Sequence, residues 1–190
     1  MKLRTTFALA ATLFASQAQA VNVEHILQNF LDESVKSWAS APEIISAIQA
    51  QNLTTAGFNE AHILTLDSAW QSEVGGDATP MIDQVLNNAA ADFLRSKISQ
   101  MDNVVTEVFI MDSMGLNVAA SGVTSDYWQG DEAKFTQTFP NGPDAVHFSD
   151  VDFDESSQTY QAQISMTIVD PSNGTAIGAM TVGVLADNLD

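Results

Sequence analysis

The sequence predicts an α+β fold in which a helical region precedes five mainly antiparallel strands. Up to about residue 101, apolar residues recur at helical spacing. From residue 103 onward they fall in short runs rich in β-branched and aromatic residues, separated by turn-forming Gly, Pro, Asn and Asp. We therefore expect a single domain at 21–190, with a helical part at 21–101 and a sheet part at 102–190.

Residues 1–20 have the pattern of a secretory signal peptide. Lys2 and Arg4 precede an apolar run at 7–14, and Ala18-Gln19-Ala20 forms a small-x-small cleavage site. The run is too short to span a bilayer, although an N-terminal anchor is the alternative interpretation. We expect a mature chain that begins at Val21, is periplasmic and is not inserted in a membrane.

The charge balance excludes polyanionic partners. The chain has 6 basic and 24 acidic residues among 190, a net charge of −18, and removal of Lys2 and Arg4 leaves −20 for residues 21–190. Nucleic acids and anionic membrane surfaces are therefore excluded as partners. The sequence has no Cys, so packing and not disulfides must stabilise the fold.

Four helices are expected in the first half of the chain. Pro42 and Pro80 suit first helical turns, Asn59 suits an N-cap, and Gly75-Gly76 interrupts the pattern. The expected helices are 23–38, 42–51, 59–70 and 80–98.

The second half predicts strands joined by turns. A hairpin with a turn at 112–115 opens it, and a second turn at 170–174 separates the last two strands. Acidic residues at 131–132 suit the start of a short helix. The expected strands are 104–111, 116–121, 145–151, 160–169 and 175–185, with the short helix at 131–139.

The last two expected strands have faces of different character. In the strand 160–169, one row is apolar and faces the core, comprising Tyr160, Ala162, Ile164, Met166 and Ile168. The other row is polar, comprising Gln161, Gln163, Ser165 and Thr167. The strand 175–185 has a row of small residues, Ala179, Thr181 and Gly183, which leaves room for a ligand, a packed helix or solvent.

Three segments resemble Cache domains, the PAS-like extracellular sensor domains also called PDC. They are the hairpin at 105–121, the Tyr-Trp segment at 125–132, and the closing hairpin at 168–184. The resemblance covers residues 80–190, and residues 21–79 more loosely. It implies a PAS-like sheet behind an N-terminal helical region, and a sensor that binds a small organic solute. Because such domains are usually part of a transmembrane receptor, and no second membrane span follows here, we expect a separate membrane receptor or histidine kinase as partner.

The candidate ligand-binding residues lie in and after the Tyr-Trp segment, where a pocket is expected against the sheet. Tyr127 and Trp128 can wall that pocket or pin the loop to the core. Asp126 and Asp131 can bind a ligand ammonium, or form a turn and a helix cap. Lys134 can hold a ligand carboxylate or pair with a neighbouring acid.

Two further candidates, Ser121 and His147, are placed on strands near the same region. His147 alternates with apolar neighbours and so faces away from them. A partly buried polar residue without a ligand is the alternative for His147.

Catalytic, cofactor and metal sites are not expected. The histidines at 25, 62 and 147 are far apart, and no Cys nucleophile or phosphate-binding glycine loop occurs. The acidic run 150–154 fails as a calcium loop, because Glu155 and Gln161 occupy the positions that need Gly and a bidentate carboxylate. We expect this run to be a solvated sheet edge. The predicted function is a periplasmic sensor and not an enzyme, and the alternative is a protein-interaction module without a small ligand.

Overall fold

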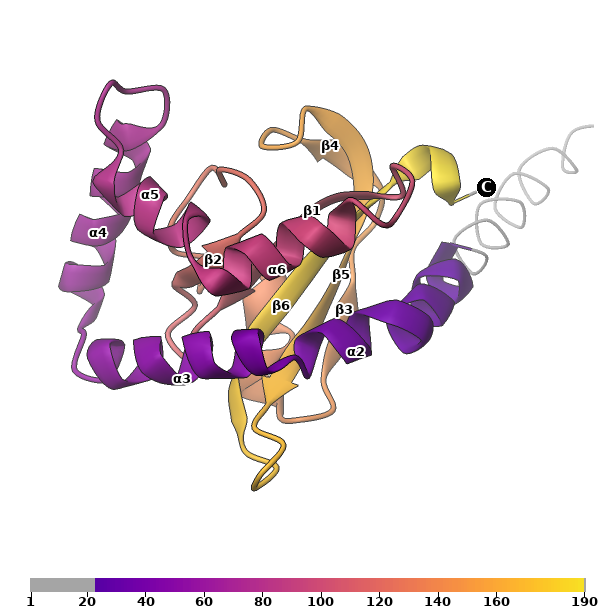
Figure 1. Ribbon diagram of the computed structural model, residues 1–190, viewed down its shortest axis with the longest axis horizontal. Helices are drawn as coiled ribbons and strands as arrows, with labels where there is room; N and C mark the ends of the chain where they lie inside the picture. Colours follow the sequence, from indigo (N-terminus) through magenta and orange to yellow (C-terminus); the bar gives the residue numbers. More distant parts are fainter. Residues whose placement is uncertain (1–22, 190) are drawn as a thin grey trace, which may run out of the picture.

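The computed structural model describes residues 23–189, which form an α+β fold with helices laid across one face of an antiparallel sheet (Figure 1). The expected signal peptide, residues 1–20, lies outside the described residues. Within residues 23–189, none of the helices combines the length and the apolar character that crossing a membrane requires.

The helical layer follows the expected order. Residues 23–39 form one continuous helix that contains a π-helical stretch. Pro42 opens the next helix at its first position, and the Asn59 side chain caps the one after it by accepting from the His62 N–H. The elements are η1 (Leu31–Val35), α2 (Lys36–Ala39), α3 (Pro42–Thr55), α4 (Glu60–Glu73), α5 (Pro80–Leu86) and α6 (Ala89–Ile98).

The expected single helix at 80–98 is wrong, because the chain breaks between α5 and α6. Asn87 and Asn88 both leave the helical region, and the Oδ1 of Asn88 accepts a hydrogen bond from the Ala91 N–H at 2.9 Å. The Asn88 amide also donates to the carbonyl of Val118 at 3.2 Å. Asparagine side chains that bond to nearby backbone compete with helix continuation, so the two residues start a new helix.

The sheet contains one strand more than expected. Its order is β2-β1-β6-β5-β3, with β4 also pairing with β5, and every pair is antiparallel. The expected strand at 145–151 ends early, and the acidic run after it forms the short edge strand β4. The strands are β1 (Val105–Met111), β2 (Asn117–Ala120), β3 (Val146–Phe148), β4 (Asp152–Asp154), β5 (Thr159–Val169) and β6 (Ala176–Leu185).

The expected short helix at 131–139 is shorter in the structure. It consists of α7 (Ala133–Thr136), and a 3-10 turn, η2 (Phe139–Asn141), follows it. A second 3-10 turn, η3 (Ala186–Asn188), ends the described chain. The N-cap of α7 is Glu132 and not Asp131, which is exposed.

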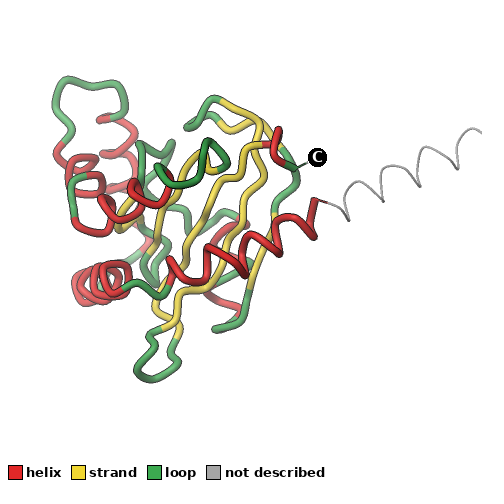
Figure 2. The backbone as a smooth tube through the Cα atoms, turned by 45° about the vertical axis from the view of Figure 1, so that its right-hand side comes forward, coloured by secondary structure: helices red, strands yellow, loops and turns green. Residues whose placement is uncertain are grey.

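One face of the sheet packs against the helices (Figure 2). The strands alternate, so every second residue of β1, β5 and β6 turns an apolar side chain toward this layer. Their partners come from the first helix, α3 and α6. Its larger fully buried members include Leu31, Ile44, Ile48, Leu94, Val108, Ile110, Ile164, Ile168, Met180 and Val182. This cluster is the main core.

The opposite face of the sheet is covered by the segment that follows β2. Phe135 of α7 packs there with Phe109, Met111 and Ala179, in a cluster that Trp70 of α4 joins. Three members of the polar row of β5 are consequently buried, since Gln161, Ser165 and Thr167 are at most 3% exposed, and Gln163 is half-buried. We call this side the covered face, defined by the side chains of Glu107, Phe109, Gln161, Gln163, Ser165 and Thr181.

Tyr160 does not join the apolar row of β5 as expected. It is 61% exposed and packs edge-on against the ring of Phe153, which is 46% exposed, on the edge strand β4. The reason is position: Tyr160 lies at the start of β5, opposite β4, where the helical layer does not reach.

Candidate functional site

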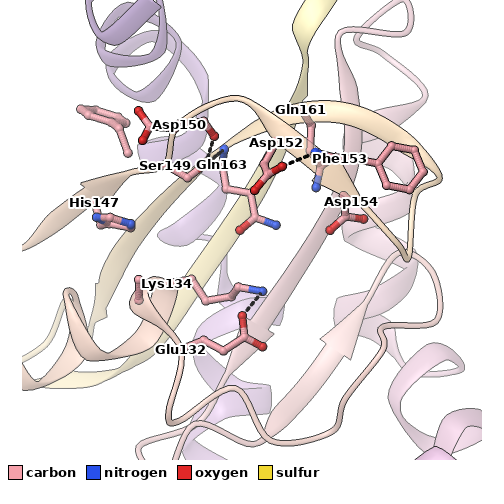
Figure 3. A pocket seen from close by; sticks show the side chains of 12 residues that line it. Glu132, Lys134, His147, Ser149, Asp150, Asp152, Phe153, Asp154, Gln161 and Gln163 are labelled. Atoms are coloured by element: carbon pink, nitrogen blue, oxygen red, sulfur yellow. Dashed lines mark hydrogen bonds and ion pairs between the residues drawn. The ribbon is translucent and has the colours of Figure 1, made fainter. Parts of the chain in front are cut away.

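A cavity of about 510 Å³ lies between α7 and strands β3, β4 and β5 (Figure 3). Its lining combines charged and polar side chains with the apolar side chains of Ala133, Phe148 and Phe153. The side chains that matter for binding are those of Lys134, His147, Asp150, Asp152, Gln161 and Gln163.

Strand alternation determines which residues reach this cavity. Gln161 and Gln163 are two positions apart on β5, so both point to the covered face. His147 pairs with Ser165 across β3 and β5 and therefore lies on the same face. Lys134 enters from the opposite side, on α7. Figure 3 shows Lys134 and Gln163 directed into the space between these elements.

Lys134 is held in place by three contacts. Its Nζ is 2.9 Å from the Glu132 carboxylate and donates to the Oε1 of Gln129 at 3.2 Å. It also lies 5.4 Å from the centre of the Phe109 ring, a cation–π contact. These contacts fix the ammonium group at the cavity wall. The side chain is still 16% exposed, so the ammonium group remains accessible to a solute.

A buried carboxyl group lies directly behind the cavity. The side chain of Glu107 on β1 accepts hydrogen bonds from the amides of Gln161 at 2.7 Å and Gln163 at 3.2 Å. Burial, and then the negative charge of Asp154, raise the pKa of Glu107 above its ordinary value of 4.5. Two of the residues that line the cavity thus depend on Glu107 for their orientation.

The Tyr-Trp loop is fastened to the helical layer. The carboxylate of Asp67 on α4 accepts from the backbone N–H groups of both Tyr127 and Trp128, each at 2.9 Å. The Tyr127 ring stacks on Trp70 at 5.7 Å, and the Trp128 indole donates to the Met114 carbonyl at 3.0 Å. Burial and the nearby Asp112 raise the pKa of Tyr127 to about 12. These contacts hold the loop against the core, which is the alternative to ligand binding that the sequence allows for Tyr127 and Trp128.

The candidate ligand-binding residues predicted from the sequence do not share one cavity in the structure. Lys134 and His147 line the cavity described above, whereas Tyr127 lines a different one, next to α3 and α5. Ser121 accepts from the Val108 N–H at 2.9 Å and lines a third hollow.

The two acidic candidates lie outside the first cavity. Asp126 accepts from Gln71 and Ser125, each at 2.8 Å, and its carbonyl accepts from Asn117. Asp131 is exposed.

Sequence reasoning did not nominate Glu107, Gln161 or Gln163 as site residues. The polar row of β5 was a usable signal for the two glutamines. A glutamate inside the otherwise apolar run 104–111 was the signal for Glu107. Within residues 23–189, no group of three or more His, Asp or Glu side chains is arranged to hold a metal ion.

Comparison with known proteins gives matches to solved structures. No family model and no curated protein matches the chain. The sensor domain of DcuS from E. coli is similar with a TM-score of 0.52 and 12% identity, over 89% of this chain and 95% of that one. At this identity the likeness shows the fold, and the predicted Cache-like α+β fold is confirmed.

Two further structures match less closely. One is the ligand-binding domain of the Campylobacter jejuni chemoreceptor Tlp3 in complex with L-valine, with a TM-score of 0.45 and 12% identity over 90% of this chain and 64% of that one. The other is the sensor domain of the V. cholerae histidine kinase DctB, with a TM-score of 0.40 and 12% identity over 96% of this chain and 59% of that one. The chain thus spans about three fifths of these two proteins.

Proposed function

We propose that this chain is a periplasmic module that binds a small organic solute in the cavity between α7 and strands β3–β5. The observation that carries the proposal is the convergence of Lys134, His147 and Gln163 on one accessible cavity of about 510 Å³. That volume is in the range of small-molecule sites. The fold shared with the DcuS sensor domain supports the same function.

The chemistry of the lining favours a solute with several polar groups. Lys134 and His147 provide donors, and Gln163 provides an amide that can donate or accept. Asp150 and Asp152 line the same cavity, and they suit the amino groups of a solute. Binding of this kind needs no chemical step, so we propose a binding role and not a catalytic one.

We further propose that occupancy is reported to a membrane partner, a receptor or a histidine kinase. This extends from the resemblance to sensor domains. Co-purification of the mature chain with detergent-solubilised membranes, with and without solute, tests this part of the proposal.

Thermal unfolding in the presence of amines, amino acids and organic acids tests solute binding. A solute at about a hundred times its Kd stabilises the folded state by about 2.7 kcal/mol, which raises the Tm by about 5–10 °C in a domain of this size. His147→Ala and Lys134→Met should each weaken binding about tenfold, the effect of one lost polar contact of about 1.4 kcal/mol.

Asp131→Asn is the matched control, because it changes an exposed acid on the same segment. It should leave the response to solute unchanged. If no solute of these three classes raises the Tm, or if the two cavity variants respond as the control does, solute binding at this cavity is refuted.

A protein-interaction role is the second candidate, and one observation favours it. Phe153 and Tyr160 form an exposed aromatic pair, with rings 5.4 Å apart, beside the edge strand β4. Exposed aromatic groups of this kind often lie in protein interfaces. Phe153 also lines the cavity, whereas Tyr160 does not. Tyr160→Ser should therefore weaken capture by membranes and leave the solute response intact if this role holds.

A further inference from the structure

Glu107 is a buried acid whose two oxygens have different surroundings. The residue is 8% exposed. Its Oε1 accepts from the side-chain amides of Gln161 and Gln163, at 2.7 and 3.2 Å. Its Oε2 lies 3.0 Å from the hydroxyl of Ser156, in the turn between β4 and β5. One oxygen therefore contacts only donors, and the other contacts a group that can donate or accept.

The Ser156 hydroxyl is shared between two carboxyl groups. Its Oγ is 2.7 Å from the Oδ1 of Asp154 as well as 3.0 Å from Glu107. A hydroxyl carries one proton and can donate it to only one of the two. The same Asp154 oxygen also accepts from the Ser157 N–H at 2.7 Å and the Ser157 hydroxyl at 2.9 Å.

A proton on Glu107 satisfies this arrangement. Ser156 then donates to the carboxylate of Asp154, and Glu107 donates its own proton to Ser156. With both acids ionised, one of the two short oxygen contacts would place lone pairs against each other. Because Asp154 already accepts three hydrogen bonds and lies nearer to solvent, the proton belongs on Glu107.

Among residues 23–189, no cation forms an ion pair with Glu107, although the charge of Lys134 partly opposes the rise in the pKa of Glu107. Asp154 on β4 is negative and close. Lys134 on α7 is paired with Glu132 at 2.9 Å. Arg95 on α6 lines the hollow on the other side of Glu107. It is paired with Asp92 at 2.5 Å, and it donates to the Leu86 carbonyl at 2.7 Å.

We propose that Glu107 is a positioning residue held as a neutral carboxylic acid. Its proton forms a hydrogen bond to Ser156 that holds the β4–β5 turn against β1, a contact that we call the latch. The same carboxyl group aligns Gln163 at the cavity. Loss of the proton places two negative carboxyl groups around one hydroxyl and frees the turn at 154–158. The cavity is thereby coupled to pH. By reciprocity, a solute that needs the aligned Gln163 binds the protonated form and raises the pKa of Glu107. Only the effect of solute on the pKa of Glu107 rests on the proposed function, because the latch is present in the solute-free protein.

The latch predicts a specific pH profile of stability for the solute-free mature chain. The pKa of Glu107 is higher in the folded than in the unfolded state, so its stabilising contribution is complete at low pH and is lost as pH rises through the folded pKa. In that interval one group lowers the Tm by on the order of 3 °C per pH unit. Glu107→Gln should remove this slope, because its amide donates to Ser156 and its oxygen accepts from Gln161.

Asp131→Asn is again the control and should keep the wild-type slope. Parallel Tm profiles for the wild type and Glu107→Gln would overturn the proposal. Hydrogen exchange adds a structural measurement: amides at 154–158 should exchange faster above the pKa of Glu107 in the wild type, and at a constant rate in Glu107→Gln. Equal acceleration in both would also overturn it.

The carboxyl carbon resonance of Glu107, assigned through bonds in the wild type, gives its pKa without any variant. A value above the ordinary 4.5 supports the latch, and a value at or below it refutes the latch. The two proposals fail separately. Solutes that do not raise the Tm refute solute binding, whereas an ordinary titration of Glu107 refutes only the latch.

Discussion

Asp112 shows how a single carboxylate joins the two layers of this fold. It lies in the turn between β1 and β2 and is fully buried. One oxygen accepts from the N–H groups of Met114 and Leu116, at 2.8 and 3.0 Å. The other accepts from Thr55 at 2.9 Å and Gln51 at 3.1 Å, both on α3. Four donors replace a counter-ion, and they bind the hairpin to the helix.

Asp112→Ala should therefore destabilise the protein strongly. Removing the acceptor leaves several buried donors unpaired, and we expect the free energy of unfolding to fall by about 3 kcal/mol or more. Urea denaturation measures the loss. Asp131→Ala, at an exposed acid, should change the same free energy by less than about 0.5 kcal/mol. A loss below about 1 kcal/mol for Asp112→Ala would show that water replaces the carboxylate.

At the residue scale, the sequence predicts part of the candidate site. The sequence predicts Lys134 and His147 as site residues, because a scarce cation and a histidine on a strand can be recognised without a structure. Both residues line the cavity. The role of Glu107 depends on Gln161 and Gln163, more than fifty positions away, and on strand pairing that places them together. No local pattern contains that information. The same holds for Asp67, which pins a loop sixty positions away.

At the scale of elements, the break between α5 and α6 depends on the Asn88 side chain. Its oxygen caps α6, and its amide donates to the carbonyl of Val118 in strand β2. Asn88→Ala should lower the free energy of unfolding by about 1–2 kcal/mol, the usual cost of losing an N-cap. Asn88→Ser keeps a capping oxygen without placing a charge against the Val118 carbonyl, and it should cost less. Chemical denaturation compares the two, and equal losses would show that the bond to Val118 is the stabilising contact.

The elements themselves were largely predictable, and the exceptions have physical causes. The spacing of apolar residues predicts the helices and the long strands β1, β5 and β6, because each of these elements buries a regular row of side chains. The segment 80–98 keeps its apolar period across the break, so periodicity alone could not reveal two helices. The strand β4 is three residues long and exposed, so its pairing with β5 left no apolar pattern.

For the molecule as a whole, negative charge is poorly compensated. Within residues 23–189, the ion pairs are Lys36–Asp32, Arg95–Asp92 and Lys134–Glu132, each between residues at most four positions apart. Local pairs of this kind contribute little to stability, and none joins distant elements. Stability must therefore come from the core between helices and sheet, and must outweigh repulsion among the acids.

This balance predicts that salt stabilises the protein near neutral pH. Raising the ionic strength from about 0.01 to 0.15 M shortens the Debye length from about 30 to 8 Å, which screens repulsion spread over the surface. We expect the Tm in sodium chloride to rise over this interval. Near the isoelectric point, which is about 4.1 for the full sequence and lower once Lys2 and Arg4 are removed, the same salt series should leave the Tm almost unchanged, because the net charge vanishes there. A Tm that falls with salt at neutral pH would instead show that attraction within ion pairs outweighs repulsion among the acids.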